Sequence, residues 1–335
     1  MTDANRVWRL RKRPVGAIAD DVLSFATEPV PEPGEGQFLV RLNYLSLDPT
    51  NRIWMSDMEQ YMPPVALGEA MRGAMCGTVV KSRVSGFSAG DVVSGLGTWA
   101  DYQLATPATH SKMIPVEGIS VAEAFGLFAI VGPTAYFGLL DVGKPKAGET
   151  VVVSGAAGAV GSLVGQIARL QGCRAVGIAG SQAKCRWLVE DLGFDAAVNY
   201  KAEALGGALK RACPGGIDVY FDNVGGAILE ACLEHMNLGG RVPTCGLISQ
   251  YNATGATPGP RNYGMLLMKR LTVRGFLVSD YASRRGEAIG ALAEWMRQGK
   301  LQFRLDVREG LENALATLRL LFTGENTGKL LLHVA

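Results

Sequence analysis

Val151-Val152-Val153-Ser154-Gly155-Ala156-Ala157-Gly158-Ala159-Val160-Gly161 is the stretch that decides the fold. The apolar run at its start is typical of a strand buried on both faces of a parallel sheet. The residues after it, 162–171, follow a helical pattern. Its glycines keep the spacing GxxGxxG, a variant of the usual GxGxxG with Ala156 in place of one glycine. A strand before such glycines and a helix after them favour a dinucleotide-binding loop, and an ordinary strand-to-helix turn is the alternative.

The rest of the chain places this loop in a larger α/β pattern. After Thr150, buried strands are expected at Arg174–Ala179, Val219–Asp222, Gly240–Cys245 and Leu271–Val278, with helices between them. This alternation predicts a doubly wound Rossmann domain with a parallel sheet. The first third is β-rich, with short apolar runs separated by Gly and Pro at Val7–Arg11, Phe38–Leu45 and Gly73–Val80.

Two further segments complete the predicted architecture. A helix is expected around Val121–Leu140, with Ser120 as its N-cap. Near the end, a helix at Leu311–Phe322 precedes a strand at Lys329–Val334. A strand that follows a completed Rossmann domain is expected to return to the first domain, which would make that domain discontinuous.

Composition excludes several classes of protein. The 335 residues are 48% hydrophobic and 19% charged, with a net charge of +2, as in a packed globular protein. The one dense basic run, Arg9–Arg13, is expected to lie solvated on a strand, so we expect no nucleic-acid partner. No stretch reads as the roughly 20 apolar residues that span a bilayer, and the start, Met1–Asn5, lacks signal-peptide features. We therefore expect no membrane partner and a cytoplasmic location, with the six scattered cysteines as buried thiols.

The end of the second Rossmann strand predicts which dinucleotide binds. NAD enzymes usually have an Asp or Glu there for the ribose hydroxyls. Here Gly180 and Ser181 are followed by Gln182, Ala183 and Lys184, so the acid is missing and an ammonium group is near. An ammonium group stabilises a 2′-phosphate, which favours NADP(H) over NAD. The alternative is that Lys184 is a solvated residue on the first turn of a helix.

Several motifs in order resemble one known family over nearly the whole chain. They are Leu47-Asp48-Pro49 with Arg52, Gly132–Leu139, Ala156–Ser162, Gly193–Lys201, Phe221–Gly226, Cys245–Asn252 and Gly324–Lys329. Together they resemble the prostaglandin reductase, alkenal reductase and curcumin reductase branch of the medium-chain dehydrogenases/reductases. The resemblance implies a GroES-like catalytic domain of residues 1–129 and 302–335, and a Rossmann NADP-binding domain of residues 130–301. It also implies NADPH-dependent reduction of the activated C=C bond of α,β-unsaturated ketones or aldehydes.

The resemblance further implies roles for individual residues. Gly158–Gly161 would cover the pyrophosphate, Lys184 and Tyr200 would hold the 2′-phosphate end, and Asn326 would reach in from the returning C-terminal segment. The cofactor-binding residues expected in this way are Gly158, Ala159, Val160, Gly161, Gly180, Ser181, Lys184, Tyr200, Asn223, Cys245, Gly246, Ile248, Ser249, Tyr251, Phe276, Leu277, Val278 and Asn326.

No metal is expected in this chain. A catalytic zinc needs three Cys, His or acidic ligands. The Gly-His-Glu motif of the zinc alcohol dehydrogenases would fall at Gly68-Glu69-Ala70, where no His occurs, and a four-cysteine structural lobe is missing. His110, His235 and His333 are isolated in the sequence and are interpreted as surface or capping residues.

Without a metal, hydroxyls, amides or water must stabilise the charge that develops on the carbonyl oxygen. Tyr251 is the candidate catalytic residue because its phenol is a donor, with a purely loop-ordering role as the alternative. Cys245 is interpreted as a small residue at a strand end rather than a nucleophile. The loop Gln250–Asn262 is expected to be flexible and to carry specificity. Candidate substrate contacts are Arg52, Tyr61, Met71 and Tyr263.

Three alternatives stay open from the sequence. A quinone reductase of the same superfamily would use the same cofactor and also lack zinc. A non-enzymatic dinucleotide-binding homologue would bind NADPH without oxidising it. A methyltransferase would leave the Asp-Asn-Val-Gly-Gly motif without a role. The family resemblance also favours a homodimer that pairs the edge strand Leu271–Val278, because pairing covers an open sheet edge.

Overall fold

The computed structural model describes residues 4–335, so Met1–Asp3 lie outside the described residues. It divides into two compact units. The β-rich unit contains the residues up to 129 together with 305–326 and 330–335. The Rossmann unit contains residues 130–304 and 327–329. Residues 302–304 and 327–329, which we expected in the catalytic domain, thus belong to the Rossmann unit.

The β-rich unit is built on a seven-stranded sheet and a separate two-stranded sheet, β1-β2. The larger sheet has the order β14-β15-β3-β4-β5-β7, with β6 also paired to β3. Phe38, Leu42 and Trp99 are fully buried in its core. The strands are β1 (Ala4–Leu10), β2 (Leu23–Pro29), β3 (Phe38–Ser46), β4 (Arg72–Ser82), β5 (Val92–Thr98), β6 (Tyr102–Ala105), β7 (His110–Lys112), β14 (Leu305–Glu309) and β15 (Lys329–His333).

The last strand of the chain joins the sheet of the β-rich unit. Strand β15 pairs antiparallel with β3, and Leu331 lies opposite Ser46. The helices of this unit are short: α1 (Thr50–Trp54), α2 (Val121–Gly126) and α10 (Ala314–Thr323). Ser120 caps α2, because its side chain accepts from the Glu123 amide while the Glu123 carboxylate accepts from the Ser120 amide.

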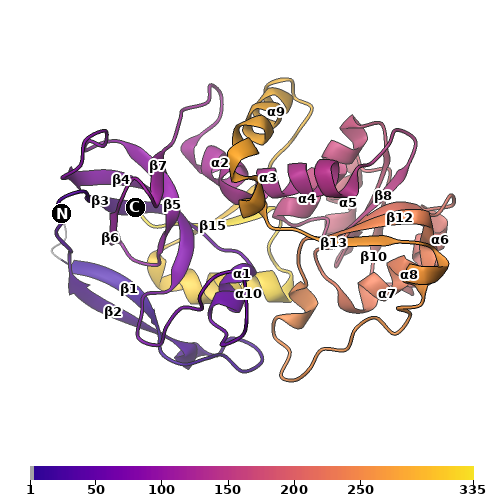
Figure 1. Ribbon diagram of the computed structural model, residues 1–335, viewed down its shortest axis with the longest axis horizontal. Helices are drawn as coiled ribbons and strands as arrows, with labels where there is room; N and C mark the ends of the chain where they lie inside the picture. Colours follow the sequence, from indigo (N-terminus) through magenta and orange to yellow (C-terminus); the bar gives the residue numbers. More distant parts are fainter. Residues whose placement is uncertain (1–3) are drawn as a thin grey trace. The chain divides into compact units, whose positions relative to one another are not determined.

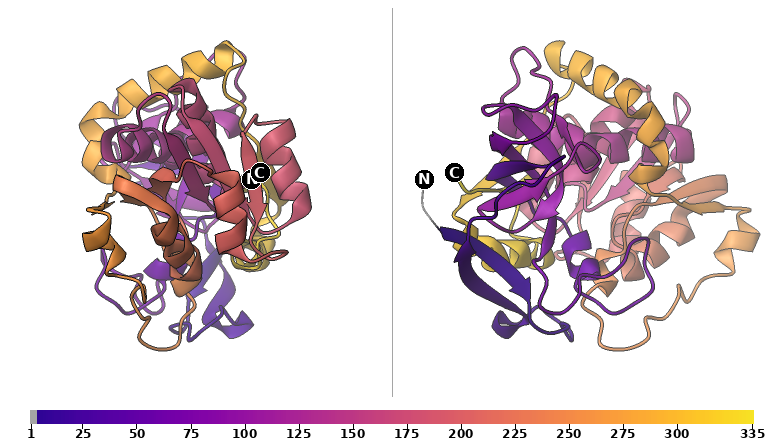
Figure 2. Two further views of the ribbon diagram at one scale, coloured as in Figure 1. Left: turned by 90° about the vertical axis from the view of Figure 1, so that its right-hand side faces the viewer. Right: turned by 60° about the vertical axis from the view of Figure 1, so that its left-hand side comes forward.

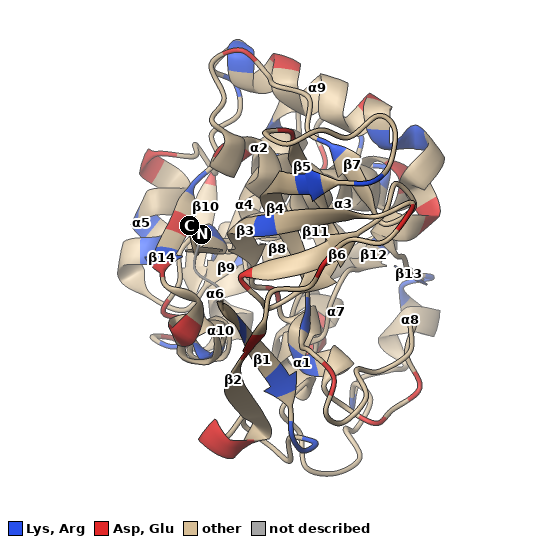
Figure 3. Ribbon diagram, turned by 90° about the vertical axis from the view of Figure 1, so that its left-hand side faces the viewer, with Lys and Arg blue, Asp and Glu red and all other residues tan. Residues whose placement is uncertain are grey.

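The basic run near the N-terminus is partly paired with acidic residues. Arg9, on β1, pairs with Glu28 of the neighbouring strand, and Lys12 pairs with Asp21. The Arg13 guanidinium donates to the carbonyl oxygens of Met55 and Val65. Figure 3 shows basic and acidic segments interspersed on the face that it presents. This run therefore forms no separate basic surface.

The Rossmann unit contains a six-stranded parallel sheet in the order β10-β9-β8-β11-β12-β13, which confirms the predicted fold. The order reverses between β8 and β11, and ligands of doubly wound folds bind outside the carboxyl ends of the strands at such a switch point. The strands are β8 (Thr150–Ser154), β9 (Arg174–Ala179), β10 (Ala196–Asn199), β11 (Ile217–Phe221), β12 (Met236–Thr244) and β13 (Thr272–Gly275).

Helices cover both faces of this sheet. Figure 1 shows α4 and α5 on one face and α6 and α7 on the other. Residues 252–262 form a long irregular loop between β12 and β13 (Figure 2). The helices of this unit are α3 (Gly132–Phe137), α4 (Ala159–Leu170), α5 (Gln182–Glu190), α6 (Leu205–Ala212), α7 (Gly226–His235), α8 (Met265–Met268) and α9 (Arg285–Arg297).

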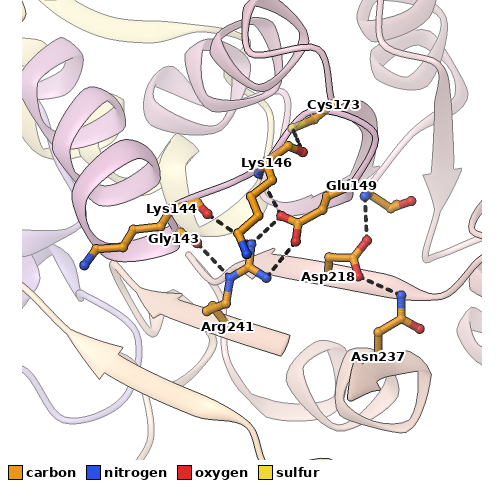
Figure 4. A network of polar contacts seen from close by, with 9 residues as sticks. Gly143, Lys144, Lys146, Glu149, Cys173, Asp218, Asn237 and Arg241 are labelled. Carbon is orange, nitrogen blue, oxygen red and sulfur yellow. Dashed lines mark hydrogen bonds and ion pairs between the residues drawn. The ribbon is translucent and has the colours of Figure 1, made fainter. Parts of the chain in front are cut away.

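A polar network lies at the amino ends of the Rossmann strands (Figure 4). The Arg241 guanidinium binds the Glu149 carboxylate through two nitrogens and also donates to the carbonyl oxygen of Gly143 at 3.0 Å. Beside it, Asp218 on β11 accepts from the side-chain amide of Asn237 at 2.8 Å. With the Thr150 amide, which donates to Asp218 at 2.8 Å, these contacts tie the start of β8 and the segment before it to strands β11 and β12.

The helical stretch Val121–Gly143 corrects one expectation. Its 23 residues are long and apolar enough to cross a membrane, by length and composition alone. The stretch is continuous because π-helical turns at Leu127–Val131 and Gly138–Gly143 join the α-helical parts. Of its most apolar window, 72% is buried inside the protein, as in a core helix.

Candidate active site

The glycine loop after β8 presents backbone amides to one point. Gly155 has a left-handed backbone, with φ at +58°, and Gly158 is the N-cap of α4. A Cβ at Gly161 would lie 2.4 Å from the Gly155 carbonyl oxygen, so only glycine fits there. The first amide of α4 that bonds back to the N-cap is that of Ser162. The amides of residues 159–161 and the positive end of the helix dipole thus suit a pyrophosphate.

A second group of predicted residues gathers at the end of β9. A Cβ at Gly180 would lie 3.2 Å from the Tyr200 ring and 3.4 Å from the Lys201 side chain. The Lys201 ammonium lies 5.9 Å from the Tyr200 ring centroid. Ser181 caps α5 by accepting from the Lys184 amide at 3.3 Å. Lys201 was missed from the sequence, although it directly follows Tyr200, and it adds a second cation to the place predicted for a 2′-phosphate.

The switch point between β8 and β11 holds Asn223 rigidly. Its backbone amide donates to the Ser154 hydroxyl at 2.9 Å, and its side-chain nitrogen donates to the Ser154 carbonyl oxygen at 2.8 Å. Because a carbonyl can only accept, this bond fixes which end of the Asn223 amide group is nitrogen. The oxygen is the end that can accept a hydrogen bond from a ribose hydroxyl.

The segment after β12 carries the predicted catalytic tyrosine. The Tyr251 hydroxyl accepts from the Leu247 amide at 3.0 Å, which closes the loop on itself. The Ser249 hydroxyl donates to the Val224 carbonyl oxygen at 2.6 Å and attaches this loop to the one after β11. Tyr251 therefore orders the loop, and its role toward a substrate stays a prediction. Cys245 is half-buried, and the desolvation of its thiol, with a smaller effect of Asp222, raises the pKa of Cys245 to about 12, so its thiolate is not formed at neutral pH.

Two other predicted cofactor segments have defined surroundings. The Phe276 ring packs directly on Gly138, whose Cβ would lie 2.3 Å from it, and lies 6.2 Å from the Phe221 ring. Any contact of Phe276 with a cofactor is therefore expected from its backbone. Gly328 pairs with Gly158 and donates to the Ala157 carbonyl oxygen at 2.9 Å.

The other members of the predicted set occupy the same loops or adjoin them. Gly246 lies beside the Tyr251 hydroxyl, and Asn326, 8% exposed, precedes Gly328 by two residues. Ile248 belongs to the short helical turn before Tyr251, while Leu277 and Val278 follow Phe276 at the end of the sheet. Their contacts with a cofactor stay predictions.

The four candidate substrate residues differ sharply in exposure. Arg52 is 3% exposed and donates to the carbonyl oxygens of Pro14 and Gly16, and Met71 is fully buried in the core of the β-rich unit. Such packing favours structural roles for both. Tyr61 and Tyr263 are 49% and 67% exposed, and their contact with a substrate stays a prediction.

No group of three or more His, Cys, Asp or Glu side chains within residues 4–335 is arranged to hold a metal ion. His110 is buried beside Thr109, at 2.9 Å, and His333 lies 2.8 Å from Glu309. His235 lies in the last turn of α7.

Comparison with known families assigns both halves of the chain. A model described as the N-terminal domain of oxidoreductase matches residues 6–113, and one described as zinc-binding dehydrogenase matches residues 159–295. An NADPH-dependent curcumin reductase of Escherichia coli is 42% identical over 99% of this chain and 97% of its own length. A 2-alkenal reductase (NADP(+)-dependent) of Nicotiana tabacum is 42% identical over 91% of this chain and 89% of its own. Prostaglandin reductase 1 of Bos taurus is 39% identical over 96% and 97%.

Solved structures agree with these relatives. CurA from Vibrio vulnificus in complex with NADPH superposes with a TM-score of 0.94 at 40% identity, covering 98% of this chain and 99% of that one. A quinone oxidoreductase of Escherichia coli complexed with NADPH has a TM-score of 0.78 at 23% identity, covering 97% and 99%. The second likeness reflects the fold alone.

Proposed function

This chain belongs to the medium-chain dehydrogenase/reductase superfamily, in the branch of curcumin, prostaglandin and alkenal reductases, and we propose that it reduces the activated C=C bond of α,β-unsaturated ketones and aldehydes with NADPH. This proposal rests on the groups that lie together at the carboxyl end of the Rossmann sheet. There the glycine loop, Gly180 with Tyr200 and Lys201 beside it, and the fixed amide of Asn223 follow strands β8, β9 and β11. These groups match the pyrophosphate, the 2′-phosphate and a ribose hydroxyl of NADPH.

When bound, NADPH supplies the hydride that adds to the β-carbon of the enone, while negative charge develops on the carbonyl oxygen. The protein's part is to hold and orient. The amides of residues 159–161 hold the pyrophosphate, and Lys184 with Lys201 neutralises the 2′-phosphate. Asn223 accepts from the ribose, and the loop that ends at Tyr251 borders the nicotinamide side.

We assign the charge stabilisation to hydroxyl, amide and water donors, with Tyr251 as the first candidate. Its phenol can donate to the developing oxyanion or act through the nicotinamide ribose, because a hydroxyl both donates and accepts. The accepted bond from Leu247 keeps the ring in one place while it does so. Proton delivery to the α-carbon then falls to solvent.

The test compares substrate classes under one condition. NADPH absorbance is followed with a simple enone, an enal and a simple quinone at matched concentrations, and again with NADH. Faster turnover of the enone or enal supports the proposal. A quinone that is reduced faster assigns the chain to the alternative, a quinone reductase, and NADPH binding without oxidation by any acceptor assigns it to the non-enzymatic homologues.

We also propose that two copies of the chain associate through the open edge of the Rossmann sheet. Strand β13 is the last in the sheet order, all four of its residues are exposed, and Val273 is 48% exposed. Leu267 and Met268, 74% and 64% exposed, lie just before it in the chain. A second copy would pair this edge and cover the apolar side chains. Sedimentation of a monomer at micromolar concentration would contradict this, and Val273→Lys is expected to shift a dimer toward monomer.

A cytoplasmic location is the last part of the proposal. All six cysteines are free thiols, and five of them are buried. Unpaired thiols are typical of reducing compartments. Fractionation that finds the protein in an oxidising compartment would contradict this.

A further inference from the structure

The carboxyl group of Asp222, directly after β11, is fully buried and gathers four hydrogen bonds on one oxygen. Oδ1 accepts from the Tyr220 hydroxyl at 2.7 Å, the Gly225 amide at 2.8 Å, the Val224 amide at 2.9 Å and the Ser154 hydroxyl at 3.2 Å. Oδ2 has no hydrogen-bond partner within residues 4–335. Burying a carboxyl group is costly unless it is hydrogen-bonded. Here the bonds converge on the turn that carries Asn223.

The turn after Asp222 has a backbone that needs these bonds. The side chain accepts the amides of residues two and three positions ahead, which is the geometry of an Asx turn. Gly225 and Gly226 follow with φ of +71° and +56°, and a Cβ at Gly225 would lie 2.8 Å from the Leu247 side chain. The path of the turn that carries Asn223 is therefore held by the Asp222 carboxylate, and Leu247 leaves room only for glycine at position 225.

The Ser154 hydroxyl links the carboxylate to Asn223 directly. It donates to Asp222 Oδ1 at 3.2 Å and accepts from the Asn223 amide at 2.9 Å. Because a hydroxyl has one hydrogen, the Asp222 acceptor orients it so that a lone pair faces Asn223. Strand β8, strand β11 and the Asn223 side chain are thereby held in one arrangement.

The main chain of the same residue positions the second loop. The Asp222 carbonyl oxygen accepts from the Cys245 amide at 2.8 Å and from the Gly246 amide at 3.2 Å. The Val224 carbonyl oxygen accepts from the Ser249 hydroxyl. Both loops expected beside the nicotinamide thus depend on the placement of Asp222.

We propose that Asp222 is a positioning residue, which touches no ligand itself but sets how Asn223 and the Cys245–Tyr251 loop meet the nicotinamide ribose. This inference rests on the proposed function, because it takes that edge of the sheet as the NADPH site. It assigns the buried carboxylate a role in cofactor affinity beyond its contribution to folding.

The test compares one substitution at each end of strand β11. Asp222→Ala removes the four bonds at the carboxyl end of β11, and the matched control Asp218→Ala removes two bonds at its amino end. NADPH affinity is measured by the fluorescence of the bound cofactor, and folding by thermal unfolding. Asp222→Ala is expected to raise the Kd for NADPH about thirtyfold, as expected for the loss of one bond to a charged group or two to neutral ones. Asp218→Ala is expected to lower the Tm and leave the Kd unchanged.

A conservative variant separates positioning from folding. Asp222→Asn keeps an oxygen at the Oδ1 place and is expected to recover about tenfold of the lost affinity. The inference is overturned if Asp222→Ala binds NADPH as the wild type does, if Asp218→Ala weakens binding equally, or if Asp222→Asn is no better than Asp222→Ala. The titration needs no electron acceptor. A wild type that binds NADPH but reduces no enone would therefore defeat the proposed function and leave this comparison readable.

If Asp222→Ala does not fold, the Ser154→Ala variant provides the test. This variant removes the hydroxyl between the carboxylate and Asn223 and leaves the other three donors in place. Ser154→Ala is expected to raise the Kd for NADPH about tenfold. Tyr220→Phe removes a donor whose ring lies in the core, and its effect on the Kd is expected to be several-fold smaller. An unchanged Kd in Ser154→Ala overturns the inference.

Discussion

Two aspartates mark opposite ends of strand β11, and they are used in different ways. Asp218, at the amino end, accepts the Thr150 amide and the Asn237 side chain through separate oxygens. Asp222, at the carboxyl end, gathers two hydroxyls and two amides on one oxygen. The amino end divides its bonds between strands β8 and β12, while the carboxyl end collects on one oxygen two bonds from strands β8 and β11 and two from the turn that carries Asn223.

The charged groups near the two ends of the sheet also differ in whether they are paired. At the amino end, Arg241 and Glu149 pair with each other, with exposed side-chain fractions of 20% and 19% (Figure 4). At the carboxyl end, the cation Lys201 stands beside Gly180 and Tyr200, where a phosphate is expected. A parallel sheet can thus use paired charges for stability at the amino ends of its strands and keep positive charge for a ligand at their carboxyl ends.

The largest expected effect comes from a single methyl group at the carboxyl end. Gly161→Ala would place a Cβ 2.4 Å from the Gly155 carbonyl oxygen and 2.8 Å from the Ala156 Cα, so the loop must move. Overpacking of this kind costs about 3 kcal/mol, or roughly a hundredfold in NADPH affinity if the loop absorbs it. Fluorescence titration with NADPH measures the loss.

The matched glycine at the amino end is the control. Gly143→Ala brings a Cβ to 3.2 Å from the Pro243 and Val219 side chains, which can shift slightly. We expect a lower Tm and an unchanged Kd for NADPH. Equal losses of affinity in the two variants would remove the distinction between the two ends.

A smaller effect is expected from Lys184, in the helix after β9, and Lys201, after β10. Lys184→Ala and Lys201→Ala should each weaken NADPH binding about tenfold or more while changing NADH binding little, because a charge-assisted bond to the 2′-phosphate is lost. The ratio of kcat/KM for the two cofactors measures this. Lys210→Ala, in the last turn of α6, is the control and should leave the ratio unchanged. A ratio that neither lysine alters contradicts their assignment.

The smallest effect is a pH-dependent stability change at the amino end. Burial raises the pKa of Glu149, but the bonds from Arg241 and the Lys146 amide outweigh it, so the pKa lies below its ordinary 4.5. A lowered pKa means that the stabilisation is present above pH 4.5 and is lost as the pH falls through the folded-state pKa. Glu149→Gln should cost about 1–2 kcal/mol at pH 7.

Urea unfolding of the wild type and Glu149→Gln at pH 7 and near pH 3 measures this change. The difference between the two proteins should shrink at the lower pH, and the KM for NADPH should be equal at pH 7. A difference that stays constant with pH, or a changed KM, would contradict a purely structural role for the pair.

Much of the Rossmann unit could be predicted, because buried parallel strands and their glycine loops leave strong local patterns. Strand β9 begins and ends where it was expected, at Arg174 and Ala179. The edge strands of the other unit were harder to predict. Strand β14, Leu305–Glu309, has two half-buried and three exposed residues, so its sequence lacks the alternation that marks a strand with one buried face.

The residues of the site were predictable where a motif names them and unpredictable where distant contacts decide. Arg52 looked available to a substrate, yet its guanidinium donates to Pro14 and Gly16, and no spacing in the sequence reveals such bonds. The bond from Ser154 to Asp222 likewise depends on strands β8 and β11 being neighbours, although they are more than sixty residues apart in the chain. Lys201 could have been found, because it directly follows Tyr200.

We propose that NADPH bound at the carboxyl end of the Rossmann sheet transfers its hydride to the β-carbon of an enone. The most direct measurement locates that hydride. NADPH carrying deuterium on either face of nicotinamide C4 is incubated with the protein and a simple enone, and the product is analysed by NMR. We expect a saturated ketone with deuterium on the β-carbon from one of the two labelled cofactors. Deuterium on the carbinol carbon of an allylic alcohol, or a saturated product without label from either cofactor, would contradict it.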